Sequence, residues 1–281
     1  SLRALFNGTT AEAYESNELD IEQLSWLICR GGWPAALTMT KNGALKQSIN
    51  YIEAIASRDI SDIDEVKREK EFTLRLLRSY ARFQGAQAPL TSIYADLKTN
   101  AESSMTEETI SSYITALKKL FVIEDAPAWN PNLRSKTAIR TSDTRYFVDP
   151  SIATAALGVG PEKLIADLNT MGLLFETMCI RDLRVYSEAL DGKVYHFRDK
   201  NGLECDAVTH LRDGRYGLVE IKLGGQRLID EGAKTLHTLS GKIDTGKMMH
   251  PSFMMVLTGT GAYAYKRKDG IWVAPVGCLK Q

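Results

Sequence analysis

The sequence has few cysteines, no long apolar run and no surplus of charge of either sign. The four cysteines, Cys29, Cys179, Cys205 and Cys278, include no CxxC pair. This scarcity excludes a disulfide scaffold and argues against a zinc site, so we expect reduced structural thiols in a cytoplasmic protein. The sequence has no run of 18 apolar residues and no signal-peptide pattern at its start. We therefore expect no membrane partner.

The zero net charge removes the simplest argument for a nucleic-acid partner, which is an overall basic balance. The 35 basic and 35 acidic residues are unevenly distributed, however. Residues 1–66 hold 5 basic and 10 acidic residues, 67–145 hold 13 and 9, and 146–281 hold 17 and 16. The basic surplus therefore falls in the middle of the chain, where a contact with DNA has to be argued locally.

Residues 1–66 predict a helical connector without recognisable chemistry. A break is expected at Gly31-Gly32-Trp33-Pro34. Beyond it, isoleucines at helical spacing predict a helix over 45–60.

Residues 67–148 predict a winged helix-turn-helix. Three helical patterns follow one another: the first runs from Phe72 to Phe83, the second begins near Pro89, and the third follows the N-cap Thr106. The third helix repeats apolar residues at helical spacing: Ile110, Ile114, Leu117 and Phe121. Two short strands, at 121–126 and 145–148, would complete the order of a winged helix.

The opposite face of the third helix carries polar and basic side chains that can contact phosphates and base edges. The candidate DNA contacts on this helix and in the loop after it are Ser111, Ser112, Thr115, Lys118, Lys119, Arg134 and Lys136. Winged helices also bind proteins, so an ordinary solvated face and a protein partner stay open as alternatives.

Residues 149–281 predict an α/β sandwich around a mixed sheet, which makes the whole chain α+β. Helical patterns run from Pro161 to Leu183, and Asn-Gly and Asp-Gly turns then separate the first strands. Strands are expected at 193–197, 203–211, 216–223, 252–258, 262–266 and 271–276, with a helix at 229–243.

Charged residues interrupt the apolar strand at 218–223. Period 2 places Glu220 and Lys222 on one face of this strand, and its hairpin partner brings Asp206 within reach. Upstream, Glu176 lies within the apolar stripe of its helix. Buried charges need a partner or a metal, and carboxylates suit Mg²⁺ or Mn²⁺. The lysine could then serve an attacking water.

Glu176, Asp206 and Glu220-Ile221-Lys222 together resemble the motif of the PD-(D/E)xK, or restriction-endonuclease-like, nucleases. The resemblance implies that Glu176, Asp206 and Glu220 would hold the metal. It also implies that Lys222 would act with Glu220 and Asp206 in catalysis.

Longer segments, "GGWPAAL", "YIEAIASRDI", "RYFVDPSIA" and the block from Leu173 to Gly224, resemble the C-terminal half of prokaryotic AAA+-type ATPases bearing a domain of unknown function. The resemblance implies a helical connector (1–66), a winged helix (67–148) and a nuclease-like domain (149–281) after an N-terminal ATPase. The sequence contains no GxxxxGK[ST] motif and opens on Ser1. ATP is therefore expected to bind only an N-terminal domain of the parent protein.

Two functions stay open from the sequence. In the first, the chain is a nucleic-acid or partner recognition arm of an ATPase, and its charged residues form a paired structural network. The alternative is an active Mg-dependent DNA endonuclease domain that cleaves phosphodiester bonds. The sequence leaves enzymatic activity undecided between them.

Overall fold

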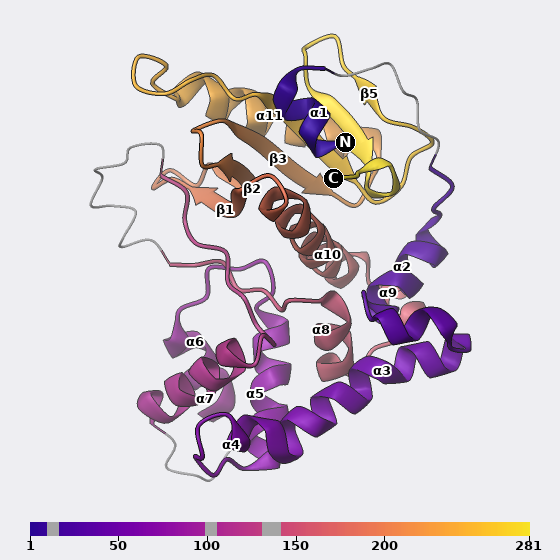
Figure 1. The fold of residues 1–281 in the computed structure, drawn as a ribbon, viewed down its shortest axis with the longest axis vertical. Helices are drawn as coiled ribbons and strands as arrows, with labels where there is room; N and C mark the ends of the chain where they lie inside the picture. Colours follow the sequence, from indigo (N-terminus) through magenta and orange to yellow (C-terminus); the bar gives the residue numbers. More distant parts are fainter. Residues whose placement is uncertain (10–16, 99–105, 131–141) are drawn as a thin grey trace. The chain divides into compact units, whose positions relative to one another are not determined.

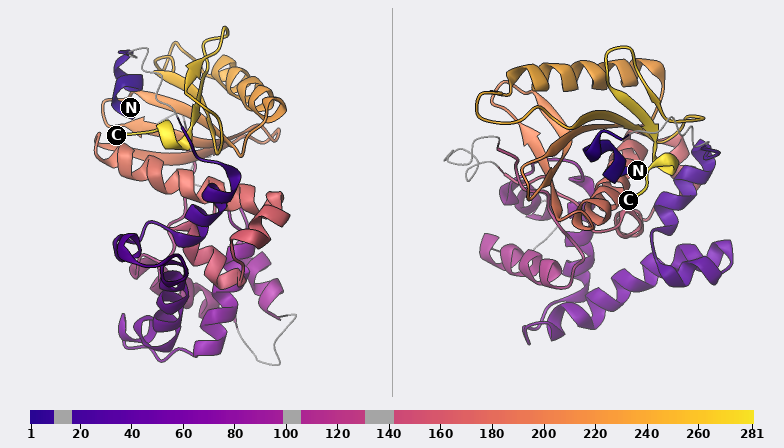
Figure 2. Two further views of the ribbon diagram at one scale, coloured as in Figure 1. Left: turned by 90° about the vertical axis from the view of Figure 1, so that its right-hand side faces the viewer. Right: turned by 45° about the horizontal axis from the view of Figure 1, so that its top comes forward.

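A computed structural model describes residues 1–9, 17–98, 106–130 and 142–281 (Figures 1 and 2). The chain divides into two units. The α/β unit comprises Ser1–Leu24, Ala126–Asp143 and Cys179–Gln281, and the helical unit comprises Ser25–Asp125 and Thr144–Met178. Each unit draws on more than one of the expected ranges 1–66, 67–148 and 149–281, whose boundaries as domains stay a prediction.

The helical unit begins within α2 (Ile21–Arg30), which precedes the expected break in the chain. The predicted helix over 45–60 is confirmed, because α3 continues into a π-helical turn and then α4. The other helices follow along the chain and include the first residues of α10. The bounds are α3 Lys41–Ala54, α4 Ile60–Asp62, α5 Lys70–Arg82, α6 Leu90–Lys98, α7 Glu107–Lys119, α8 Pro150–Leu157, α9 Pro161–Ala166 and α10 Leu168–Glu188.

The three consecutive helices predicted between 67 and 120 are confirmed as α5, α6 and α7. Each buries the expected apolar stripe, with Leu76 on α5, Ile93 on α6 and Leu117 on α7 fully buried. The N-cap prediction is also confirmed, because the Thr106 hydroxyl accepts a hydrogen bond from the Thr109 N–H. Packing of α6 against both α5 and α7 forms the core of this three-helix group.

The two strands expected after α7 are replaced by isolated bridge positions, among them an antiparallel bridge between Ile123 and Phe147. Backbone hydrogen bonds flank it, from Glu124 N–H to the Tyr146 carbonyl at 3.0 Å and from Val148 N–H to the Val122 carbonyl at 3.2 Å. The inward position predicted for Phe121 is wrong, since its side chain is 75% exposed. The helix ends at Lys119 and Phe121 has φ +54°, so the helical period no longer applies there.

The glycines of the Gly31-Gly32-Trp33-Pro34 break are held by the start of α8. Gly31 has φ +74°, and a Cβ there would lie 2.3 Å from the Ser151 hydroxyl and 2.4 Å from Asp149 Oδ1. The Gly32 N–H donates to Asp149 Oδ2 at 2.9 Å, and Trp33 Nε1 donates to the Ser151 hydroxyl at 2.8 Å. Asp149 also caps α8. The break is therefore a close contact between backbone and side chains, where a glycine is required.

The α/β unit is built on one mixed sheet with strand order β1-β2-β3-β4-β6-β5. The first three strands are antiparallel, whereas β3, β4 and β6 run parallel. The expected strands and helix are confirmed to within a few residues. Their bounds are β1 Gly192–Arg198, β2 Glu204–Leu211, β3 Tyr216–Lys222, α11 Gln226–Lys242, β4 Phe253–Thr258, β5 Tyr265–Lys266 and β6 Trp272–Pro275.

Helices cover both faces of this sheet, with α11 on one face and the C-terminal part of α10 on the other (Figure 2). The short helix α1 (Leu2–Asn7) lies beside the chain's other end, since the Leu2 N–H donates to the Lys280 carbonyl at 2.8 Å. Its Phe6 ring meets Phe253 of β4 edge to face, with 5.1 Å between ring centroids.

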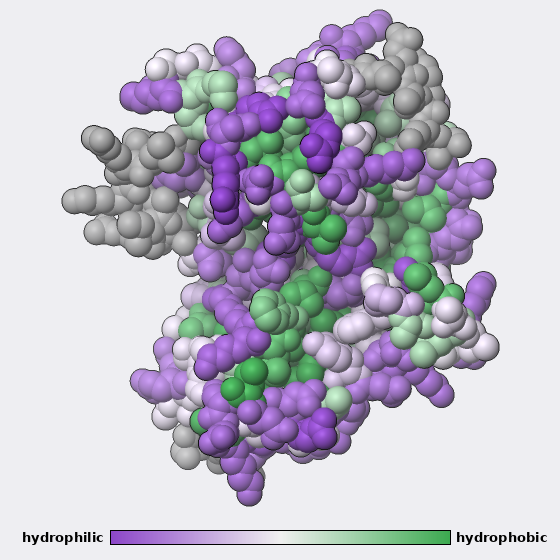
Figure 3. Space-filling model, viewed as in Figure 1, coloured by the Kyte–Doolittle hydropathy of each residue, from purple (hydrophilic) through white to green (hydrophobic). Residues whose placement is uncertain are grey.

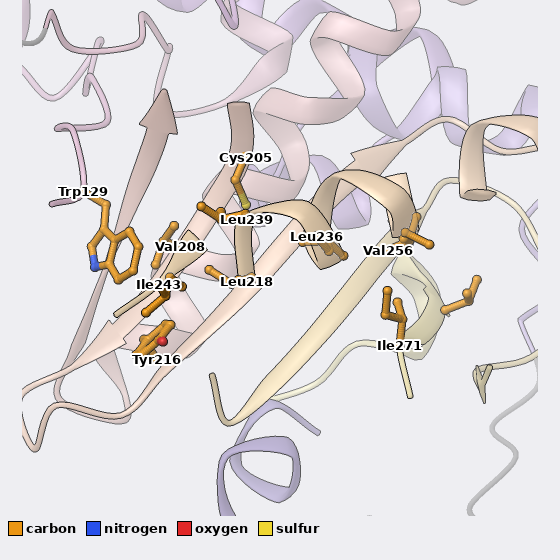
Figure 4. Close-up of a cluster of buried hydrophobic side chains, with 12 residues drawn as sticks. Trp129, Cys205, Val208, Tyr216, Leu218, Leu236, Leu239, Ile243, Val256 and Ile271 are labelled. Atoms are coloured by element: carbon orange, nitrogen blue, oxygen red, sulfur yellow. The ribbon is translucent and has the colours of Figure 1, made fainter. Parts of the chain in front are cut away.

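The core beneath α11 is an apolar cluster that includes Leu218 of β3, Val256 of β4 and Leu236 of α11 (Figure 4). Trp129 belongs to it, although it lies within the range expected for the winged helix. The segment around Trp129 adds to the edge of β1: Trp129 N–H donates to the His196 carbonyl at 2.6 Å, and His196 N–H donates to the Pro127 carbonyl at 3.0 Å.

Hydrophilic side chains cover most of the surface displayed in Figure 3, with separate apolar areas among them. Within the described ranges, no helix combines the length and the apolar character needed to cross a membrane.

We expect Gly31→Ala to destabilise the helical unit by about 1–3 kcal/mol more than the matched variant Gly158→Ala. Both glycines have φ near +70°, but only Gly31 has side-chain atoms within 4 Å of the added Cβ. Chemical denaturation, monitored by circular dichroism, measures the difference in the free energy of unfolding between the two variants. Equal losses in the two variants would show that Asp149 and Ser151 exert no steric constraint on Gly31.

Candidate functional site

Asp206, Glu220 and Lys222 converge in the α/β unit, where β2 and β3 lie side by side. The strands pair antiparallel with Ala207 opposite Val219, so Asp206 reaches the end of β3 that carries both charges. The Lys222 ammonium Nζ lies 2.7 Å from Glu220 Oε2 and 3.2 Å from Asp206 Oδ2. Asp206 Oδ2 also accepts the Ile221 N–H at 2.7 Å. One lysine thus links two carboxylates on neighbouring strands.

The cluster lies on the α11 face of the sheet. A Cβ added to Gly232 of α11 would lie 3.3 Å from Glu220 Cβ and 3.6 Å from Lys222 Cε, so a helix glycine packs directly over the pair. The side chain of Glu220 is 4% exposed, compared with 24% for Lys222 and 19% for Asp206. Glu220 is therefore enclosed, whereas the other two residues retain contact with solvent.

The pKa values in the cluster follow from two carboxylates sharing one ammonium group. Burial raises the pKa of Glu220 to about 8; the Asp206 carboxylate adds to the rise and the Lys222 ammonium opposes it. Burial lowers the pKa of Lys222, but the Asp206 and Glu220 carboxylates outweigh burial and leave it raised. The cluster carries one excess negative charge when both acids are ionised. A proton on Glu220, the more buried acid, relieves that excess.

Glu176, the third expected metal ligand, belongs to the helical unit. Its carboxylate accepts a hydrogen bond from the Tyr146 hydroxyl. It also lies against Gly85, where a Cβ would be 3.1 Å from Glu176 Oε1. Sequence periodicity placed Glu176 correctly on the inner side of its helix. It could not indicate the Tyr146 partner, which is 30 residues away in the chain.

The carboxylates of this arrangement are already satisfied by protein donors. Across the described parts of the chain, no group of three or more His, Cys, Asp or Glu side chains is positioned to hold a metal ion. In the α/β unit, Asp206 and Glu220 offer two carboxylates whose nearest cation is the Lys222 ammonium. The expected Mg²⁺ or Mn²⁺ stays a prediction, and its binding would require Lys222 to move away from at least one acid.

The candidate DNA contacts on α7 differ in whether their side chains already bond to other residues of the protein. Lys118 pairs with Asp125 at 2.8 Å, and the Ser112 hydroxyl accepts from the Arg68 guanidinium at 3.1 Å. The Thr115 hydroxyl donates to the Ser111 carbonyl within the helix. Lys119 is exposed. Arg134 and Lys136 lie outside the described residues.

A buried polar network beside α7 was not predicted from the sequence. Asp125 has a 2% exposed side chain and accepts from Arg145 at 2.7 Å, from Lys118 and from the Tyr80 hydroxyl. Arg145 is therefore engaged in an ion pair with a buried acid, although it had been counted with the basic surplus. The acid in a short apolar stretch, Val122-Ile123-Glu124-Asp125-Ala126, was the available signal.

Two protein-family models match separate parts of the chain. A family model for a domain of unknown function, DUF8612, matches residues 21–163, just over half of the chain. The chain belongs to the DUF8612 family. A model for a second domain of unknown function, DUF4143, matches residues 171–279. A search of curated proteins gives no match.

In this DUF8612 chain the helical features and the charged cluster fall under different matches. Helices α5 to α7, the Gly31-Gly32 break and the Asp125 network lie within the DUF8612 match. The whole sheet and the Asp206, Glu220 and Lys222 cluster lie within the DUF4143 match, as does Glu176. The acid and lysine cluster is thus a feature of the DUF4143 region.

We expect the free energy of unfolding to depend on the titration of Glu220. Its folded pKa of about 8 exceeds the ordinary value of 4.5, so the folded state binds the extra proton between these pH values. This contribution to stability is complete below about pH 4.5 and is lost as pH rises through about 8. Glu220→Gln should remove a slope of up to about 1.4 kcal/mol per pH unit in this window.

The measurement is urea denaturation of the wild type and Glu220→Gln at several pH values. The control is Glu231→Gln, at an exposed position on α11. The wild type and the Glu231 variant should share one pH profile. A Glu220→Gln profile parallel to them would show that Glu220 is ionised in the folded state throughout this range.

Proposed function

We propose that this chain is the C-terminal part of an AAA+-type ATPase and acts there as a recognition arm for a nucleic acid or a partner protein. In this proposal the α/β unit is nuclease-like in architecture, and its charged cluster is structural. The observation that carries it is the Lys222 ammonium, which bonds both carboxylates while Glu220 is enclosed beneath α11. A lysine engaged in this way balances charge in the folded protein.

Architecture supports the assignment of the units. DUF4143 domains are commonly paired with AAA ATPase domains. The order α10, β1, β2, β3, α11, β4, with helices on both sheet faces, is typical of restriction-endonuclease-like domains. Helices α5 to α7 followed by the Ile123–Phe147 bridge are compatible with a winged helix. ATP would bind the N-terminal domain of a cytoplasmic parent protein.

A DNA contact would use the end of α7. Lys119 is exposed at the C-terminal turn of this helix, and Thr115 is exposed one turn earlier. Lys118 is held by Asp125, so it is less available to a phosphate. The exposed lysine and hydroxyl suit phosphate contacts that position a protein without reading sequence.

The endonuclease alternative is favoured by one observation. Asp206 and Glu220 meet Lys222 on adjacent strands, as the PD-(D/E)xK motif requires of its strand residues. If this alternative were right, Mg²⁺ or Mn²⁺ would bind at Glu176, Asp206 and Glu220. A stability measurement and a cleavage measurement together distinguish the two functions.

We expect Lys222→Ala to lower the free energy of unfolding by about 3 kcal/mol at pH 8, because it leaves Glu220 and Asp206 without their cation. The double variant Glu220→Gln with Lys222→Met should recover the part of the loss that comes from Glu220, since its neutral amide needs no counter-charge, whereas Asp206, at 19% exposed, keeps its contact with solvent. The control is Lys234→Ala, at an exposed position on α11, which should change stability little.

The wild type, Lys222→Ala and a further variant, Asp206→Ala, are then incubated with supercoiled plasmid and Mn²⁺. The structural role predicts no difference in cleavage between wild type and Asp206→Ala. If the wild type cleaves, Asp206→Ala does not, and Lys222→Ala unfolds like the wild type, the cluster is a catalytic site and the recognition-arm proposal is wrong.

Duplex DNA binding should depend on Lys119. Fluorescence anisotropy over a series of salt concentrations measures how many phosphates the protein neutralises. Lys119→Ala should reduce the slope of log K against log salt by about 1, whereas Lys46→Ala, at an exposed position on α3, should leave it unchanged. An identical slope for all three proteins would exclude α7 from the DNA contact and favour a protein partner.

A further inference from the structure

A cleft lies in the α/β unit at the end of the sheet remote from the acid and lysine cluster. It has a volume of about 750 Å³ and is formed where β1 begins, where β2 ends and where the chain approaches β4. Asp206 is near the beginning of β2, whereas the cleft lies around Leu211 at its end. The chief lining residues in the argument are Glu188, Asp191, Lys193, Tyr195, His210 and Arg212.

Four charged side chains face this cleft without an ion pair to any other described residue: Glu188, Asp191, Lys193 and Arg212. Nearby charges behave differently, since Arg215 pairs with Asp213 at 2.7 Å. Unpaired charges of both signs within one concavity can meet a ligand that carries an anionic group together with hydrogen-bond donors.

The inner wall of the cleft is aromatic. His210 Nδ1 accepts a hydrogen bond from Trp129 Nε1 at 3.4 Å, and burial lowers the pKa of this imidazole. The Tyr195 ring meets His210 edge to face, with 6.3 Å between centroids. Tyr195 is half-buried, and Met248 lines the cleft as well. A flat apolar group can pack against such a wall, because tyrosine and methionine present polarisable surface.

We propose that this cleft binds a nucleoside phosphate unit. The base packs against Tyr195 and Met248, and the phosphate is met by Lys193 and Arg212. Glu188 and Asp191 accept hydrogen bonds from the sugar hydroxyls or the base amino groups. The volume is within the range of about 300–1,000 Å³ found for small-molecule sites. This inference does not rest on the proposed role of Lys222.

The shared chemistry could come from a free nucleotide or from the phosphorylated end of a strand. Isothermal titration calorimetry with the full chain uses three probes: adenosine monophosphate, a 5′-phosphorylated pentathymidylate and inorganic phosphate. We expect the monophosphate or the pentanucleotide to bind with a Kd below about 1 mM. Stronger binding of the pentanucleotide identifies a strand end, and equal binding identifies a free nucleotide unit.

The double variant Lys193→Gln with Arg212→Gln should weaken that binding at least tenfold. Both side chains are exposed, so the fold should be retained, which circular dichroism checks. The exposed Lys268→Gln on the β5–β6 turn is the control and should bind as the wild type does. The proposal is overturned if neither nucleotide binds, if inorganic phosphate binds as tightly, or if the double variant retains full affinity.

Discussion

The α/β unit depends on how a carboxylate is accommodated inside the sheet. Glu220 is enclosed in β3, a strand with neighbours on both sides, and a bare carboxylate there would be strongly destabilising. Lys222 supplies the counter-charge from the same face of the same strand, and Asp206 holds the lysine from β2. Gly232 permits α11 to pack over this arrangement without a side chain in the way. Sheet pairing, helix packing and charge balance thus constrain the same few residues.

The helical unit solves a similar problem with a different set of residues. Asp125 is as enclosed as Glu220 and receives Arg145, Lys118 and Tyr80 from three other segments. Burial raises the pKa of Tyr80 well above its usual value, and the Asp125 carboxylate adds to that rise, so the phenol remains a donor. This network engages the ammonium of Lys118, whose side chain remains 43% exposed, and the neighbouring Lys119 is exposed as well.

In both units some charged side chains bond to one another and others are exposed. The pKa values of Glu220 and Lys222, which bond to each other, are both raised, and structural ion pairs perturb pKa values as catalytic sites do. The charges that lie free of one another, at the cleft beside Tyr195, are on the opposite end of β2 from the motif that drew attention first. Recognition of a ligand requires groups with unsatisfied capacity, and the cleft provides them.

The sequence by itself determined the local structure of this protein. Period 2 placed Glu220 and Lys222 on one face of β3, the Asn-Gly and Asp-Gly turns set the hairpins, and Thr106 fixed the start of α7. These features depend on residues within one or two turns of each other. Tertiary structure alone decided the partners: Tyr146 for Glu176, Asp125 for Arg145, and the sheet core for Trp129. A side chain's burial and its hydrogen bonds depend on segments that are distant in sequence. The local periodicity of the sequence does not indicate which distant segment will pack against a given side chain.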